Sequence, residues 1–247
     1  MTAGFSADFT NDVLRIQLNN PPMNTLTIPQ MDAIAGVISE AGNKARAIVV
    51  QSDIPGCFSF GIDPKAVLST DLSGRQKIFV SLGNLVKSFL AAGVPIVTLV
   101  EGPAMAGGAV LAALGDYVVM HEGDAKVCFS EAKVGLPLPG FVQMLVKEKC
   151  GPQNFFEIGV MARNMTADLA KRMGFTQATF SESADGQKRV DEILQKIGRL
   201  SGVVLRKTLL DSRQPMLLEL DRFLKDQGEF VPFLSDEYLG AGLRNLQ

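Results

Sequence analysis

The chain has 247 residues, of which 47% are hydrophobic, and its formal net charge is −2. This length suits one large domain, or a core with an appendage, that buries a sizeable hydrophobic core. The balanced charge, with no basic stripe, argues against nucleic acid or an anionic membrane as the partner. The three cysteines, Cys57, Cys128 and Cys150, lack metal-site spacing and predict a reducing compartment and no bound metal.

The sequence also lacks the signals of a membrane or secreted protein. No apolar run approaches the ~20 residues that a membrane-spanning helix needs. The N-terminal stretch MTAGFSADFTND has no basic region followed by an apolar segment, which a secretory signal requires. We therefore expect a cytoplasmic protein with no membrane partner.

Short apolar strands alternate with helices in the first part of the chain. Strand patterns cover residues 13–18, 47–50, 96–100, 117–120 and 127–129. Helical patterns begin at Ile28, after the N-cap candidate Thr27, and cover residues 72–92. Alternation of this kind predicts the α/β class.

The rest of the chain is predicted to be nearly all helical. Helical patterns cover residues 141–149, 154–161, 167–173, 185–200, 203–212 and 216–224. A polar, turn-rich stretch at 180–186 suggests a boundary, with a core over 1–184 and a helical oligomerisation region over 185–247. The second region carries more apolar residues than a solvent-facing tail needs, so we expect it to pack against neighbouring subunits.

The stretch from Glu101 to Gly135 has the pattern of an active site. After the strand at 96–100, glycines at 102, 107 and 108 predict a tight turn that opens a helix. Such a turn leaves backbone N–H groups unpaired and lets a ligand approach them closely. Glu131 follows about one strand later, in an apolar neighbourhood. A charge-stabilising turn and one candidate base together indicate a catalytic site.

Each of these features alone also has a simpler interpretation. The glycine pair suits close packing, Glu131 suits a solvated strand end, and the loop CFSFGID suits an ordinary turn. His121 is the only histidine, and its setting indicates a surface turn, which argues against a Ser–His–Asp or Cys–His nucleophile. No nucleotide-binding glycine motif is present.

Four motifs together resemble those of the crotonase, or enoyl-CoA hydratase/isomerase, superfamily. Phe58–Asp63 (FSFGID) is similar to F-S-A-G-x-D, and Ala104–Asp116 (AMAGGAVLAALGD) is similar to A-x-G-G-G followed by L-A and C-D. Glu131 precedes Gly135 by four residues, as the family's catalytic glutamate does, and Asn19–Leu26 matches an early N-x-P-x-N-x-L turn. The resemblance runs from about residue 13 to the C-terminus. It implies a spiral of ββα turns and a C-terminal helical region that packs in a homotrimer or hexamer.

The resemblance also implies an acyl-CoA substrate and a site to hold it. By position, the backbone N–H groups of Ile62 and Gly107 would form an oxyanion hole for the thioester carbonyl, which suits a charge that develops during the reaction. Phe60 and Asp63 would belong to the substrate pocket. Lys65 would lie near the CoA phosphates, or else be a solvated loop lysine. CoA would be part of the substrate, and no cofactor is expected.

Val110 is the informative departure from the family pattern. Hydratases of this family carry a glutamate there and a second one at the position of Glu131, whereas Val110 would only shape the pocket. One remaining glutamate resembles the mitochondrial-type 3,2-trans-enoyl-CoA isomerases of fatty-acid β-oxidation. The AGG turn, the aliphatic Ile62 and the segment Phe230–Ser235 (FVPFLS, similar to F-V-S-F-I-S) favour the same branch.

The resemblance therefore implies an isomerase that moves a 3,4 double bond to the 2,3 position, with Glu131 as proton shuttle. Two alternatives stay open: a hydratase or another crotonase reaction, such as decarboxylation in polyketide assembly, and a non-catalytic acyl-CoA-binding subunit. Fold alone does not decide between them. The acyl chain length, the pathway and the choice between trimer and hexamer are not indicated by the sequence.

Overall fold

The computed structural model describes residues 4–244. A six-stranded sheet in the order β1-β2-β4-β6-β8-β11 runs through the molecule. Only β1 and β2 pair antiparallel; the other neighbours are parallel. The strands are β1 (Phe5–Thr10), β2 (Val13–Leu18), β4 (Ala47–Ser52), β6 (Ile96–Val100), β8 (Tyr117–His121) and β11 (Ala178–Phe180). The central strand β6 is buried at every position, as expected where helices cover both faces of a parallel sheet.

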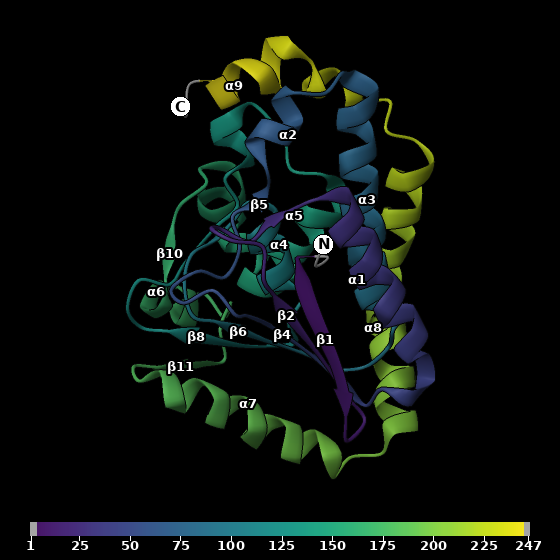
Figure 1. Cartoon of the computed structure of the whole chain (residues 1–247), viewed down its shortest axis with the longest axis vertical. Coiled ribbons are helices and arrows are strands. Elements are labelled where there is room, and N and C mark those ends of the chain that lie inside the picture. The colour runs from purple at the N-terminus through teal and green to yellow at the C-terminus, as the bar shows by residue number, and fades with distance from the viewer. Residues whose placement is uncertain (1–3, 245–247) are drawn as a thin grey trace.

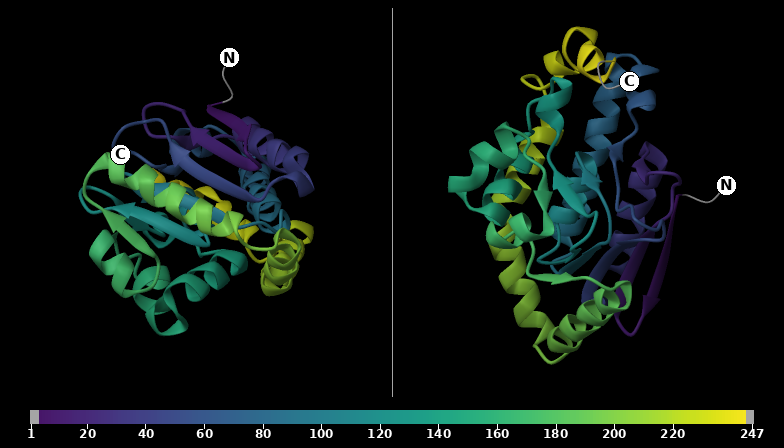
Figure 2. Two further views of the ribbon diagram at one scale, coloured as in Figure 1. Left: turned by 90° about the horizontal axis from the view of Figure 1, so that it is seen from below. Right: turned by 90° about the vertical axis from the view of Figure 1, so that its left-hand side faces the viewer.

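Helices cover the two faces of this sheet unequally (Figures 1 and 2). The larger core contains apolar side chains of α1 (Ile28–Ala41), α3 (Leu72–Ala91), α4 (Gly107–Ala113), α5 (Gly140–Cys150) and α8 (Gly202–Lys225). On the other face, α7 (Ser183–Gly198) packs Val190 and Ile197 against Val49, Val97 and Val119 of the strands. Thus α7 belongs to the same packed unit as the sheet, although the expected boundary lay at residues 184/185.

Each of the first four parallel strands leads into a short strand and then a helix. The short strands are β3 (Thr25–Leu26), β5 (Gly61–Ile62), β7 (Ala104–Met105) and β9 (Lys126–Cys128), and the five-residue helix α2 (Pro64–Leu68) follows β5. They pair outside the main sheet, as β3–β5 and as β10 (Met165–Thr166)–β9–β7. The ββα spiral that the resemblance implied is confirmed. In such a spiral, the loops that follow successive strands lie close together.

The secondary structure differs from the sequence prediction in several places. Instead of two helices, α8 runs uninterrupted through Pro215, because its buried face of Met216, Leu220 and Phe223 continues past the proline and packs on the core. Such packing offsets the lost backbone hydrogen bond. The helix expected at 154–161 is a 3₁₀ turn (Pro152–Asn154) and a π turn (Phe156–Val160). The exposed strand β1 and the short β11 were not predicted.

The chain ends in a 3₁₀ turn (Val231–Leu234), a π turn (Asp236–Gly240) and α9 (Ala241–Arg244), after α6 (Ala167–Arg172) and α7–α8. Leu220, Phe223 and Phe230, three of the apolar residues that suggested an oligomer, are buried within the chain itself. They no longer argue for a subunit interface, and assembly stays a prediction; residues 245–247 of the proposed region lie outside the described residues. None of the described helices is long and apolar enough to cross a membrane.

Candidate active site

Two glycine-containing loops meet backbone to backbone at the end of the spiral. A Cβ atom added to Gly61 would lie 2.6 Å from the Gly107 nitrogen, and one added to Gly108 would lie 2.1 Å from the Ser59 carbonyl oxygen. Gly61 also has a φ of +74°, which side chains disfavour. Only glycine therefore fits at 61 and 108, and these residues let the two loops touch.

This contact brings the Ile62 and Gly107 amides together. A Cβ atom at residue 107 would lie 3.6 Å from the Ile62 nitrogen, and both residues line one cavity. Gly107 is the first residue of α4, so its N–H has no partner within the helix. The arrangement can hold an oxygen that gains negative charge.

A buried polar network fixes the first of these loops. The Asn24 side chain donates hydrogen bonds to Ser52 Oγ (2.7 Å) and to the Phe58 carbonyl (3.0 Å). Ser59 Oγ donates to the Asn24 carbonyl (2.7 Å) and accepts from the Gly61 N–H (3.1 Å). Neither Asn24 nor Ser59 was predicted as a site residue, although Asn24 is the second asparagine of the early N-x-P-x-N-x-L motif. Both act on the loop as positioning residues.

Ala106, just before Gly107, has a left-handed backbone conformation, with φ +48° and ψ −120°. A non-glycine residue in such a conformation costs about 1–3 kcal/mol, and it persists only where its surroundings fix it. Here the Ala106 N–H donates to the Cys128 carbonyl (2.8 Å), which ties the turn to β9. Because Glu131 follows β9 by three residues, the same strand connects the turn to the candidate base.

Ile62, Gly107 and Glu131 all line a cavity of about 450 Å³. Most of its walls are apolar, and Glu131 is the only carboxylate among its lining residues. The other polar side chains there, which the sequence did not indicate, are Thr25, Cys128, Ser130, Lys133 and Asn164. A mostly apolar cavity with few polar groups is typical of a small-molecule site.

Glu131 begins a 3₁₀ turn, Glu131–Val134, that Gly135 ends in a left-handed conformation. Its side chain is 8% exposed, and Oε2 has no hydrogen-bond partner among the described residues. Burial raises the pKa of Glu131 to about 7, opposed in part by a hydrogen bond from its own backbone N–H. A carboxylate that titrates near neutral pH is suited to take up a proton and return it.

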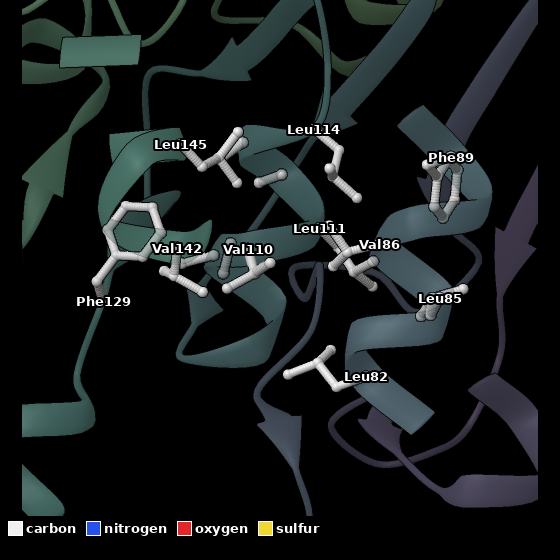
Figure 3. Close-up of a cluster of buried hydrophobic side chains, with 14 of the residues drawn as sticks. Leu82, Leu85, Val86, Phe89, Val110, Leu111, Leu114, Phe129, Val142 and Leu145 are labelled. Atoms are coloured by element: carbon white, nitrogen blue, oxygen red, sulfur yellow. The ribbon is translucent and has the colours of Figure 1, made fainter. Parts of the chain in front are cut away.

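Val110 lies outside this cavity, contrary to expectation. It is 1% exposed and packs in the core, where Figure 3 shows it beside Val142 of α5. The reason is the path of α4, which passes between α3 and α5 and is buried at every position. Residue 110 therefore supplies core packing and no chemistry.

The remaining predicted residues are placed as follows. Phe60 lines the cavity and is 37% exposed, whereas Asp63 does not line it: its side chain caps α2 by accepting from the Lys65 N–H (2.8 Å). Lys65 is exposed and also outside the cavity, so its role toward CoA phosphates stays a prediction. His121 accepts from the Gly123 N–H (3.0 Å) and is not part of the site.

The sequence matches a known enzyme family over most of its length. Residues 8–211 match the enoyl-CoA hydratase/isomerase family. The peroxisomal enoyl-CoA delta isomerase 1 of Arabidopsis thaliana is 24% identical over 67% of this chain and 73% of its own length. The enoyl-CoA isomerase/hydratase claC of Penicillium crustosum is 26% identical over 80% of this chain, which spans only 23% of that longer protein.

Solved structures show the same fold over almost the whole chain. Human mitochondrial delta3-delta2-enoyl-CoA isomerase superposes with a TM-score of 0.92 at 17% identity, covering 98% of this chain and 96% of its own. An enoyl-CoA hydratase from Bacillus halodurans gives 0.87 at 20% identity, covering 98% and 99%. Isomerases and hydratases thus share this architecture, and the fold does not separate the two reactions.

Proposed function

Because this chain belongs to the enoyl-CoA hydratase/isomerase family, we propose that it moves the double bond of an enoyl-CoA from the 3,4 to the 2,3 position. The observation that carries the proposal is a single buried carboxylate, Glu131, in an otherwise mostly apolar cavity beside two neighbouring backbone amides. The resemblance to proteins named as delta isomerases supports the same choice.

In this reaction Glu131 removes a proton from the α carbon of the thioester. Negative charge then develops on the thioester oxygen, where the N–H groups of Ile62 and Gly107 stabilise it as a dienolate. Protonated Glu131 returns a proton at the γ carbon, which leaves the double bond conjugated with the carbonyl. One group suffices because both carbons lie on one side of a flat intermediate. CoA is part of the substrate, and no cofactor takes part.

Hydration by the mechanism of this family needs a second carboxylate, and the cavity-lining residues include only Glu131. In the hydratases that the sequence resembles, two glutamates hold and activate the water. Here the second position is Val110, which lies in the core and cannot exchange a proton. We therefore propose that hydration is at most a minor reaction of this protein.

The direct test offers the purified protein a 3-enoyl-CoA and a 2-enoyl-CoA of the same chain length. We expect formation of the conjugated 2-enoyl product from the first and little hydration of the second. Val110→Ala serves as a control: it should lose stability by about 1–2 kcal/mol, as for a small core truncation, but keep most of its turnover. Fast hydration of the 2-enoyl-CoA would assign a hydratase. Acyl-CoA binding without any turnover would assign a binding subunit.

A further inference from the structure

The C-terminal segment, residues 231–244, forms one wall of the active-site cavity of its own chain. Leu239 and Leu243 line the cavity and are themselves buried. Figure 1 shows α9 at the same end of the molecule as α2, which precedes α3 and supplies another part of the wall through Val67. The segment therefore closes one side of the cavity.

The segment also contacts the turn that carries Glu131. A Cβ atom at Gly135 would lie 2.9 Å from the Tyr238 carbonyl oxygen, and one at Gly242 would lie 2.3 Å from the Val134 carbonyl oxygen. No side chain fits between these backbones. Displacing the segment would therefore expose the Glu131 turn to water.

A single arginine joins this segment to the opposite wall. Arg75, in the first turn of α3, is 4% exposed. Its Nε donates to the Val67 carbonyl (3.0 Å), Nη1 to the Leu234 carbonyl (2.8 Å) and Nη2 to Asp236 Oδ1 (2.7 Å). A planar guanidinium suits this task because it directs several donors at once in fixed directions.

The three hydrogen bonds of Arg75 differ in strength. The Asp236 side chain is 74% exposed, so its ion pair with Arg75 is screened by water and contributes little. The two carbonyl bonds are buried, and hydrogen bonds to a charged donor are the stronger kind. Arg75 therefore holds the segment mainly through the Leu234 backbone.

We propose that Arg75 is a positioning residue that fastens segment 231–244 over the cavity of its own chain, and that this closure keeps water away from Glu131. The proposal rests on the proposed function, in which Glu131 is the base. Arg75 itself does not line the cavity, so it acts through the segment and not on the substrate.

The pH profile distinguishes closure from a charge effect. Besides Glu131, the ionisable side chains among the cavity-lining residues are Cys128 and Lys133. The elements that surround the cavity also carry Lys65 on α2, Arg75, Lys77 and Lys87 on α3, Lys126 on β9, and Asp236, Glu237, Tyr238 and Arg244 in segment 231–244. Loss of the Arg75 charge alone would make the Glu131 carboxylate less favourable and raise its pKa. Opening of the segment would hydrate Glu131 and lower its pKa. The two explanations thus predict shifts of opposite sign.

The experiment compares Arg75→Met with Arg46→Met. Arg46 is a matched control, because its guanidinium also makes three hydrogen bonds, in its case to the backbone carbonyls of Ile197, Gly198 and Leu200, away from the cavity. In Arg75→Met we expect hydrogen exchange of the amides in 231–244 to accelerate by at least about tenfold, the loss of one charged hydrogen bond. The acid limb of kcat/KM should move to lower pH, and KM should rise. Arg46→Met should change none of these.

Unchanged exchange in folded Arg75→Met, or an acid limb that moves to higher pH, would overturn the proposal. If Arg75→Met does not fold, Arg75→Lys keeps the charge without the fork and should show the same changes to a smaller extent; wild-type exchange in that variant would overturn the proposal equally. Hydrogen exchange needs no turnover. Absence of isomerase activity in the wild type would therefore reject the proposed function and still leave the role of Arg75 decided.

Discussion

Arg213 and Glu131 are buried to a similar extent, 5% and 8% exposed, but their surroundings differ. Arg213, on α8, donates to the carbonyls of Leu90 (3.3 Å) and Val94 (3.2 Å) and to Asp116 Oδ2 (2.7 Å). Asp116 in turn accepts from the Ile96 N–H (2.7 Å). By contrast, Oε2 of Glu131 has no partner among residues 4–244.

The contrast separates a structural charge from a candidate catalytic one. Around Arg213, two contacts join α8 to the segment that leads from α3 into β6, and the third reaches Asp116, which itself bonds the first residue of β6, so the charge serves the fold. Around Glu131 the fold removes water and leaves Oε2 without a partner among the described residues, which costs free energy and raises the pKa of the carboxyl group. Such costs are tolerated where a proton must move.

Arg213→Met removes the structural charge and should have the largest effect on stability of the substitutions proposed here. Removing one partner of a buried pair leaves several acceptors unpaired and typically costs about 3–5 kcal/mol; partial exposure of Asp116 favours the lower end. Denaturant unfolding would measure the loss. Turnover per folded molecule should stay near that of the wild type, and a selective loss of turnover would show that the division between the two sites is wrong.

Gly107→Ala should lower the catalytic rate without destabilising the fold. The added Cβ would make only ordinary contacts of 3.4–3.6 Å, one of them with the Ile62 nitrogen. It would occupy space beside the two amides and hinder the thioester oxygen there. Loss of one oxyanion-hole donor costs about 100-fold in rate, or about 2.7 kcal/mol.

Gly36→Ala is the matched control for this substitution, because residue 36 lies exposed on α1 and an added Cβ would meet nothing within 4 Å. It should gain about 0.5–1 kcal/mol of stability from helix propensity and keep full activity. Wild-type kcat in folded Gly107→Ala would remove residue 107 from the proposed oxyanion hole.

Local sequence patterns predicted the α/β class, the glycine turn and the candidate base Glu131, because each depends on short-range signals. The resemblance of the motifs to the family implied the ββα spiral and the pairing of the Ile62 and Gly107 amides. Gly61, Gly107 and Glu131 stand in motifs where backbone conformation or apolar context is visible within a few residues. The family match confirms the superfamily that these motifs suggested. The strand β2 and the helix α3 were likewise predicted nearly to the residue.

Features that depend on distant contacts were not predictable. Val110 was expected in the pocket because it stands at the family's glutamate position, and helical spacing does not reveal which face α5 covers. The sequence predicted two helices, at 203–212 and 216–224, but packing along the whole helix carries α8 through Pro215. Arg75 shows no local signal at all, because two of its acceptors lie about 160 residues away, in the C-terminal segment.

One substitution, Glu131→Gln, tests the central claim that Glu131 is a desolvated, unpaired base. Gln keeps the shape but cannot take up a proton, so isomerase turnover should fall by at least about 100-fold, with acyl-CoA binding retained. The same substitution should make the protein more stable at pH 8, although it lowers turnover. The pKa of Glu131 is raised from its usual value near 4.5 to about 7, so wild-type stability falls as the pH rises between these values.

The measurement is therefore the unfolding free energy of both proteins across this pH range, together with turnover of a 3-enoyl-CoA. At pH 8 the variant should be more stable than the wild type by about 3 kcal/mol beyond any difference at pH 4.5, because the pKa of Glu131 is about 7 in the folded protein and near 4.5 in the unfolded chain. The advantage should shrink as the pH is lowered. Undiminished turnover in Glu131→Gln, or a stability difference that does not change with pH, would contradict the account.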